Sequence, residues 1–324
     1  MAATTRLTCA ALALFVALAA SAQPRAAGRA DSLLAALAAS DTALFARVRD
    51  AKEQGTTLLA EVRVLETLRG PALPKRIAVQ AGAQAQLEGD AQLRVGETYL
   101  LLVRRAGDRY EVPEGLRRTV VPISDDTQRD AARALLRGYA AGGAALDVQL
   151  RASATLANPP LRAGVLEDLS HRLVPADSPF LLKLAAQRDA PDDARQFAIA
   201  GLAGLPAPLP AALADLLRAD EPVAIRQAVV NAHSAHGARD VVERGLADPD
   251  AAVRQTAVDS LADPQSVAVL ERHFDREPAQ AVKLAIVRQL GLIGTDASRA
   301  ALRRVVARAS DPAIRRAAEP WLSP

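Results

Sequence analysis

The sequence predicts an α+β multidomain protein, in which a small N-terminal all-β barrel precedes an α-solenoid of about six helix pairs. Apolar and polar residues alternate over much of residues 41–123, as in strands. A helical block with a basic residue then recurs every 28 to 33 residues. Only 3% of the residues are aromatic and alanine dominates the apolar set, which suits closely packed helices. A chain of 324 residues is long enough for two domains.

Residues 1–22 are predicted to form a signal peptide. Arg6 precedes an apolar run of about 14 residues, which closes with the Ala-Ser-Ala cleavage pattern at 20–22. Because spanning a bilayer takes roughly 20 residues, we expect cleavage before Gln23 and export to the periplasm or the medium. Cys9 is the only cysteine. The mature chain is therefore expected to contain no disulfide and no Cys-ligated metal.

Residues 38–124 are predicted to form the β module. In "TTLLAEVRVLETLRG" (56–70) every second residue is mainly apolar, so one face of this strand is expected to be buried. Gly107-Asp108 between two apolar runs indicates a hairpin. Five short strands are expected: one each over 43–51, 56–70 and 75–81, and the two strands of the hairpin within 93–112.

The order "EVRVLETLRG", a short strand, "LRVGETYLLLV" and a hairpin resembles the netrin/tissue-inhibitor-of-metalloproteinase-like OB barrel over about 80 residues. The resemblance implies a binding module rather than an enzyme. In the metalloproteinase inhibitors an N-terminal cysteine and a disulfide-braced edge reach the zinc of the target. Since the mature chain is expected to lack cysteine, that activity is not expected here.

Arginines cluster around the predicted hairpin. They suit an anionic component of a bacterial envelope, such as a lipopolysaccharide phosphate. More often, such arginines form the solvated side of strands or protect a sheet edge against unwanted strand pairing. The residues are Arg104, Arg105, Arg109, Arg117 and Arg118.

Residues 125–145 are predicted to form a connecting helix, with an aspartate cap at its start and Gly142-Gly143 at its end. Residues 146–324 then carry the repeated block. Apolar residues stand one position before, three after and usually seven after its basic residue, which places them on one helical face. The basic residues are Arg162, Arg195, Arg226, Arg254, Lys283 and Arg315. The first helices of the pairs are expected at 146–157, 178–188, 209–219, 238–248, 265–275 and 298–309.

Residues 146–322 resemble HEAT and HEAT-like repeats, and "DPDAAVRQTAVDSL" is the most family-like block. Each amphipathic pair needs its neighbours to bury its apolar face. By the resemblance, the basic residue stacks along the solenoid and bonds to acidic turns of adjacent repeats. The resemblance also implies a protein partner.

The aspartates around that block are interpreted as fold signals. Asp248 before Pro249 is predicted to be an N-cap with proline at the first helical position. Asp263 is expected to open the next helix, and Asp259 to be solvated.

Other chemistries find little support. A formal charge of +3 without a basic stripe argues against nucleic-acid binding. His233, His236 and Asp240 carry zinc-ligand types, but His233 falls on a core position of the repeat, so no metal is expected. No nucleophile elbow, metalloprotease or P-loop motif occurs, so neither a cofactor nor catalysis is expected.

Two functions remain open. The first is an exported, non-catalytic scaffold that binds a protein partner through the solenoid, with the OB-like module as a second binding surface. The alternative is an envelope-ligand binder that recognises an anionic glycan or lipid headgroup through Arg104, Arg105 and Arg109.

Overall fold

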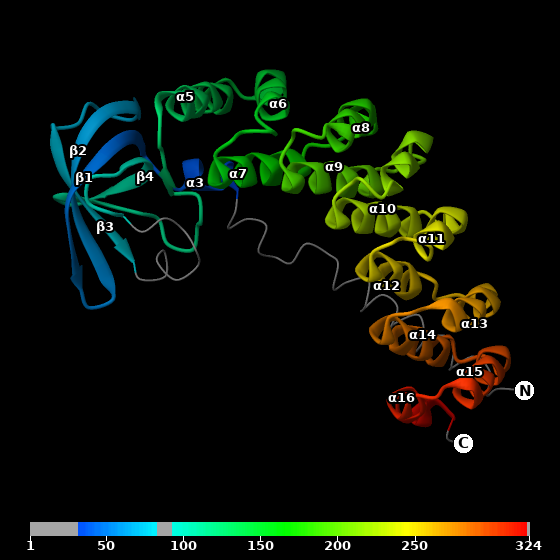
Figure 1. Cartoon of the computed structure of the whole chain (residues 1–324). Coiled ribbons are helices and arrows are strands. Elements are labelled where there is room, and N and C mark those ends of the chain that lie inside the picture. The colour runs from blue at the N-terminus through cyan, green and yellow to red at the C-terminus, as the bar shows by residue number, and fades with distance from the viewer. Residues whose placement is uncertain (1–31, 83–92, 323–324) are drawn as a thin grey trace, which may run out of the picture. The chain divides into compact units, whose positions relative to one another are not determined.

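The structure, a computed structural model, describes residues 32–82 and 93–322 (Figure 1). The predicted signal peptide and most of the predicted loop over 82–92 lie outside this range. The chain divides into two compact units, one ending at Arg172 and one beginning at Leu173. The first unit contains a β-sheet with helices and the second is helical, so the predicted α+β class is confirmed. No helix in the described ranges is long and apolar enough to cross a membrane.

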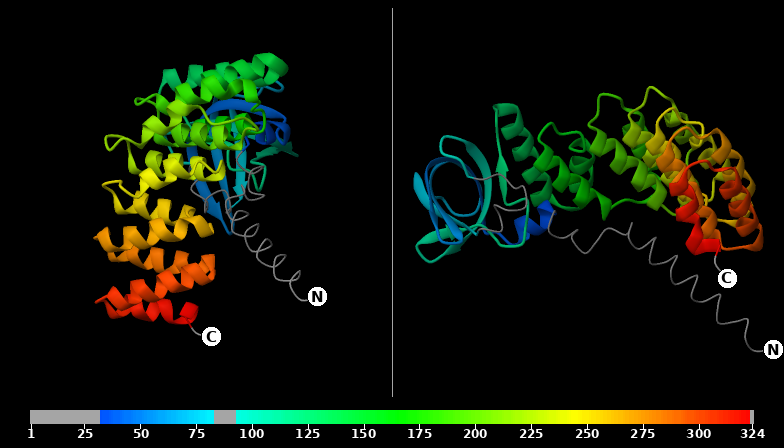
Figure 2. Two further views of the ribbon diagram at one scale, coloured as in Figure 1. Left: turned by 90° about the vertical axis from the view of Figure 1, so that its right-hand side faces the viewer. Right: turned by 60° about the horizontal axis from the view of Figure 1, so that its bottom comes forward.

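The sheet of the first unit has six strands in the part of the chain that the structure describes. Strands β1, β2, β3, β5 and β4 are neighbours in that order, and β4 also pairs with β1 and with β6, so the pairing leads back to its start (Figure 2). The predicted hairpin joins β4 to β5, and Gly107 adopts φ 65°, which glycine tolerates without strain. The strands are β1 (Thr42–Gln54), β2 (Thr57–Arg69), β3 (Arg76–Gly82), β4 (Thr98–Ala106), β5 (Arg109–Glu111) and β6 (Val120–Pro122).

Alternating side chains of these strands form a buried cluster, which includes Ala46, Val62 and Leu101. Phe45 points to the other side of β1 and is also fully buried. The guanidinium groups of Arg129 and Arg133 lie 5.9 and 5.6 Å from the centre of its ring. A helix therefore covers the outer face of β1, and the sheet is buried on both sides there.

Among the described residues, four helices belong to the first unit. The predicted connecting helix is present, and the Asp125 carboxylate caps it by accepting from the Gln128 amide at 2.8 Å. A short helix before the sheet was not predicted, because six residues are too few for a clear period. The helices are α3 (Leu33–Ala38), α5 (Asp126–Ala141), α6 (Gly143–Ala152) and α7 (Pro159–Ser170).

Asp168 on α7 fastens three of these helices together. Its buried carboxylate accepts hydrogen bonds from the Ser32 hydroxyl at 2.5 Å, the Leu34 amide at 2.9 Å and the Tyr139 hydroxyl. Burial and the neighbouring Asp168 carboxylate raise the pKa of Tyr139, so its hydroxyl stays protonated and donates. Helices α5, α6 and α7 thus belong to the same compact unit as the sheet.

The second unit is a stack of helix pairs. One expected first helix, over 209–219, is instead a 3-10 helix: it has no capping side chain and follows three alternating prolines. The first helices are α8 (Ser178–Ala186), η2 (Ala211–Leu217), α11 (Arg239–Gly245), α13 (Val267–Arg276) and α15 (Asp296–Arg308). The second helices are α9 (Asp192–Gly204), α10 (Val223–Ala235), α12 (Ala251–Ser260), α14 (Gln280–Ile293) and α16 (Pro312–Leu322), and short 3-10 turns η1 (Pro175–Asp177) and η3 (Pro264–Ser266) precede α8 and α13.

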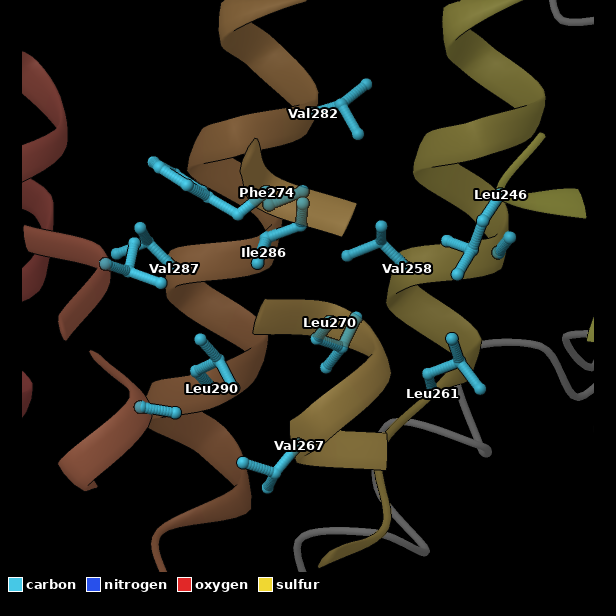
Figure 3. Packing of buried hydrophobic residues seen from close by; sticks show 14 of the residues in the cluster. Leu246, Val258, Leu261, Val267, Leu270, Phe274, Val282, Ile286, Val287 and Leu290 are labelled. Carbon is cyan, nitrogen blue, oxygen red and sulfur yellow. The ribbon is translucent and has the colours of Figure 1, made fainter. Parts of the chain in front are cut away.

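One continuous apolar cluster runs through the C-terminal pairs (Figure 3). Val253, Ala257 and Leu261 occupy the predicted positions before, three after and seven after Arg254, and all three are buried. Val258 and Ile286 extend the cluster from α12 to α14. Each helix pair buries its apolar face against the next pair, as expected for stacked repeats.

Candidate interaction surfaces

The second helices form one row along the second unit. Figure 1 shows α9, α10, α12, α14 and α16 side by side, with the first helices forming another row along the upper right of them. The basic residue of each block lies near the start of its second helix, where the chain has just turned. Successive basic residues therefore come close to the turns of neighbouring pairs.

Arg226 and Arg254 make the same set of contacts one repeat apart. The Arg226 guanidinium donates to both carboxylate oxygens of Asp248 at 2.8 and 2.9 Å, and to the Glu221 carbonyl oxygen. The Arg254 guanidinium donates to both carboxylate oxygens of Glu277 at 2.8 Å, and to the Asp248 carbonyl oxygen at 2.9 Å. Each arginine thus binds its own turn through the backbone and the next turn through a carboxylate.

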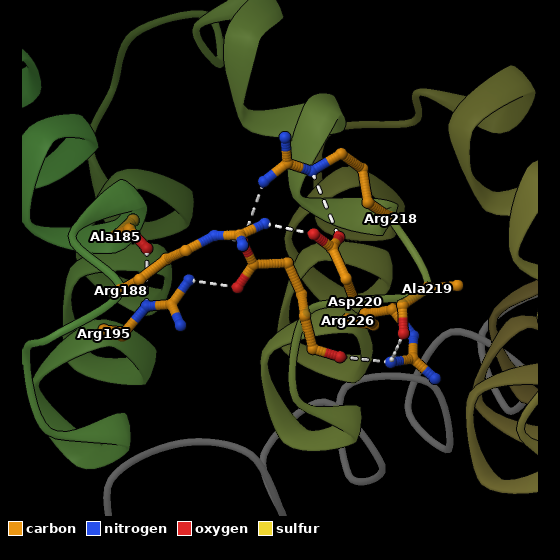
Figure 4. Close-up of polar contacts among 8 residues, drawn as sticks. Ala185, Arg188, Arg195, Arg218, Ala219, Asp220 and Arg226 are labelled. Atoms are coloured by element: carbon orange, nitrogen blue, oxygen red, sulfur yellow. Dashed lines mark hydrogen bonds and ion pairs between the residues drawn. The ribbon is translucent and has the colours of Figure 1, made fainter.

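Arg195 extends this pattern by one repeat. It is 1% exposed and donates to the Ala185 carbonyl oxygen at 2.9 Å and to the Glu221 carboxylate at 2.5 Å (Figure 4). The alternation runs from Arg195 to Glu221, Arg226, Asp248, Arg254 and Glu277. We call these six residues the arginine ladder.

Two exposed arginines surround the first acid of the ladder. Arg188 and Arg218 reach the Glu221 carboxylate at 3.2 Å from outside, and both also pair with the exposed Asp220 (Figure 4). Burial by itself would raise the pKa of Glu221, but the hydrogen bond and charge of Arg195, with those of Arg218 and Arg188, outweigh it and lower the pKa. Glu221 is therefore charged at neutral pH although it is 3% exposed.

The same opposing effects determine the pKa of Glu277, the last acid of the ladder. Burial acts to raise the pKa of Glu277, and the Arg254 guanidinium together with the Ala279 amide lowers it by more. The Ala279 amide donates to the Glu277 carboxylate at 2.8 Å. Glu277 is thus held ionised by one buried cation and one backbone donor.

The contacts of the other basic residues of the repeated block are of other kinds. Arg162 and Arg315 donate to carbonyl oxygens of their own turns, those of Leu156 and Ala309, and Arg315 is exposed. Lys283 lies 5.3 Å from the centre of the Phe274 ring instead of forming an ion pair of the ladder type. An ammonium group cannot reproduce the fork of donors that spans a carbonyl and a carboxylate.

Asp248 has a different role from the predicted one. The N-cap of α12 is Asp250, whose carboxylate accepts from the Ala252 amide at 2.8 Å. Asp248 is buried and binds Arg226, so the prediction that Asp248 is the N-cap was wrong. Asp263 does cap the next turn, accepting from the Gln265 amide at 2.7 Å. Asp259 is exposed and pairs with Arg288 across to α14 at 2.6 Å.

The ladder acids share a signal that the sequence analysis missed. Glu221, Asp248 and Glu277 each precede a proline, and each stands five or six residues before the basic residue of the next second helix. The proline lies one or two residues before the first residue of the helix, while the acid before it faces the arginine of the preceding repeat. An acid-proline pair at this spacing would have identified all three.

Small and amide side chains lie on the exposed face of α9, α10 and α12, beside charged residues such as Asp259, whereas α14 and α16 expose arginines. Gln196, Gln227 and Gln255 follow the basic residue directly in α9, α10 and α12, and all are partly exposed. The Gln227 amide donates to the Thr256 hydroxyl at 3.0 Å, which bridges α10 to α12. Asn231 is exposed on the same helix as Gln227. This row offers hydrogen-bonding groups at the regular spacing of the helices, about 8–10 Å.

The arginines of the hairpin are engaged locally. Arg104 pairs with Glu111 across the hairpin at 3.4 Å, and Arg109 donates to the Gln80 side chain at 3.2 Å. The Arg105 side chain donates to the Gly107 carbonyl oxygen at 3.3 Å. Arg117 and Arg118 lie in the turn after β5 and also have interaction partners. The structure thus brings the first three together around one hairpin, where neighbours already bind them.

His233 and His236 each bind a different backbone carbonyl oxygen. His233 is buried, its Nδ1 lies 2.9 Å from the Val229 carbonyl oxygen, and burial lowers its pKa. The His236 ring bonds instead to the Ala203 carbonyl oxygen at 3.0 Å. Over residues 32–82 and 93–322, no group of three His, Cys, Asp or Glu side chains is placed to hold a metal ion.

Comparison with known proteins agrees with the repeat pattern. A family model described as HEAT repeats matches residues 239–322, which contain α11 to α16. A search of curated proteins found no match to the chain. The C-terminal helix pairs therefore resemble HEAT repeats, and such repeats suggest protein binding.

Proposed function

We propose, from the HEAT-repeat match over residues 239–322, that this chain is an exported, non-catalytic scaffold that binds a protein partner through its second helices. The observation that carries the proposal is the row of α9, α10, α12, α14 and α16, in which the arginine ladder links the turns from α9 to α14. Buried ion pairs that link successive turns fix how neighbouring helices sit, so their exposed face is preorganised.

The polar character of that face suits a protein surface. Exposed amides such as Gln255 and Asn231 both donate and accept, and small residues between them leave the helix backbone accessible. Repeat stacks use such extended faces for binding. The OB-like nature of the first unit belongs to the same proposal, and the pairing of β4 back to β1 supports it.

Site-specific crosslinking tests the proposed surface. A photoreactive residue at Asn231 or Gln255 in the full-length chain, expressed in its own cells, is expected to capture a discrete protein. The same residue at Arg303, exposed on the first-helix row, is the matched control. Equal capture at Arg303, or none at either second-helix position, contradicts the proposal.

Export is tested separately by intact mass. We expect the purified protein to begin at or near Gln23, and a retained leader would contradict cleavage.

The envelope-ligand alternative makes a distinct prediction. Because Arg104 and Arg109 already bind Glu111 and Gln80, their charges are partly compensated. Partner capture that survives charge reversal of Arg104 and Arg105 favours the scaffold. Its loss on that reversal, with the second-helix substitutions silent, favours the alternative.

A further inference from the structure

Strand β2 has a free edge at its C-terminal end. Its pairing with β3 ends at Arg63, opposite Arg76, whereas its pairing with β1 continues to Arg69. Over residues 65–69, no strand of the described chain pairs with β2 on the β3 side. Leu65, at the start of this edge, is 42% exposed. Unpaired strand edges readily accept another extended chain.

An apolar groove adjoins this edge. The cavity has a volume of about 590 Å³ and lies between the end of β2, α3 and α5. Leu34 and Leu37 from α3, Leu68 from β2 and Leu136 from α5 line it. Leu34 is 45% exposed, which is high for a leucine in a fold that buries most of its aliphatic side chains. The groove is therefore wide enough and apolar enough for side chains of another segment.

The groove also has an uncompensated positive charge. Arg129, Arg133 and Arg137 stand four residues apart on α5, so they lie along one side of the helix. Arg129 pairs with Asp126 at 2.6 Å. Arg133 donates hydrogen bonds to the Glu66 carboxylate from Nε and from Nη2. Arg137 lines the groove and is exposed, and among the described residues it has no hydrogen bond or ion pair. The charge of Arg137 also acts on Glu66. The hydrogen bond from Arg133 is the main cause that lowers the pKa of Glu66, and the charges of Arg129 and Arg137 lower it further.

From these three observations we propose that the groove binds an extended segment of another protein with an aliphatic side chain next to a carboxylate. The segment pairs with β2 along residues 65–69 and adds a strand to the sheet. Its aliphatic side chain enters between Leu34, Leu68 and Leu136, and its carboxylate meets the Arg137 guanidinium. This site is separate from the row of second helices and goes beyond the scaffold function proposed above.

A random dodecapeptide library displayed on phage, selected on the full mature chain, tests the proposal. Enriched peptides are expected to carry Asp or Glu within two positions of an aliphatic residue. Arg137→Glu is expected to weaken the binding of a synthetic enriched peptide at least tenfold, as measured by fluorescence anisotropy. Replacing the peptide's acid with lysine is expected to restore binding to that variant. Arg49→Glu, which changes an exposed arginine of β1 outside the groove, is the matched control and leaves binding unchanged.

Backbone methylation tests the strand pairing. N-methyl groups at alternate residues of the peptide are expected to abolish binding, while those at the residues between have little effect. The proposal is overturned if no peptide is enriched, if Arg137→Glu and Arg49→Glu act alike, or if methylation is tolerated everywhere. The proposal is also overturned if no peptide is enriched and the chain forms a dimer that Arg137→Glu disrupts. That result would show that the groove binds a second copy of the chain. None of these outcomes affects crosslinking at Asn231, so the two proposals fail separately.

Discussion

Ladder arginines lie inside the helical stack, whereas the arginines of the β4–β5 hairpin lie on the surface of the sheet. Arg195 and Arg226 are 1% and 4% exposed and each binds a carboxylate and a carbonyl oxygen. The Arg104 side chain is 57% exposed and makes one long ion pair. A guanidinium removed from water has to satisfy its donors within the protein, while an exposed one leaves them to solvent. Clustering in the sequence therefore indicates less about an arginine's role than the carboxylates around it.

Glu221→Ala should give the largest effect. It leaves the Arg195 guanidinium buried without its carboxylate, which costs about 3–5 kcal/mol of unfolding free energy. Urea denaturation followed by circular dichroism measures the loss. Asp220→Ala is the adjacent control, and because the Asp220 side chain is 58% exposed it should cost less than about 1 kcal/mol. Equal losses for the two variants would remove the distinction between buried and surface ion pairs.

Arg226→Lys should have an intermediate effect. Lysine keeps the charge but cannot bind both oxygens of Asp248 and the Glu221 carbonyl oxygen at once. We expect a loss of about 1–3 kcal/mol in the same denaturation experiment, since a buried donor or acceptor is left unsatisfied. The matched substitution in the hairpin, Arg104→Lys, should be neutral. A neutral Arg226→Lys would show that charge alone holds the ladder together.

Acid should weaken the ladder. The folded-state pKa values of Glu221 and Glu277 lie below the ordinary value of 4.5, so both carboxylates stabilise the fold above that pH. Their contribution is lost as the pH falls below 4.5 through the folded-state pKa values, by up to about 1.4 kcal/mol per pH unit for each group. Melting temperatures at pH 7 to 3 measure this. The double variant Glu221→Gln and Glu277→Gln should show a shallower acid slope, and an unchanged slope would exclude these two groups as its source.

Arg104→Ala should have the smallest effect. It removes one exposed ion pair with Glu111, so we expect a change below about 0.5 kcal/mol in unfolding free energy. A loss comparable to that of Arg226→Lys would show that the hairpin ion pair stabilises the fold as much as a ladder contact does.

The sequence predicted the helix stack well because its signal is local and repeated. Arg254 fixes the register, and Val253 and Leu261 fall on one face at 3.6 residues per turn. The ladder partners were harder to predict, since Asp248 satisfies the rule for a helix cap as well as the rule for a buried acid. Arg137 was missed because its neighbours Arg129 and Arg133 look identical to it until their carboxylates are placed.

Contacts between distant parts of the chain were not predictable from local patterns. Helix α3 is held by Asp168, and 136 residues separate Ser32 from that carboxylate. Six residues with few polar groups do not form a stable helix alone. No periodicity in the sequence indicates such a partner.

The Asp168 contact has a consequence for the order of folding. Leu34 and Leu37 form one wall of the groove, and α3 is fastened there by a residue that is synthesised long after the sheet. Contacts of such sequence separation form late, because a long loop has to close first. The strands can therefore pair before the groove exists, and the edge of β2 stays open during that interval. The peptide site is complete only after α7 has packed against α3. A chain that ended before Asp168 would therefore have the sheet without its groove.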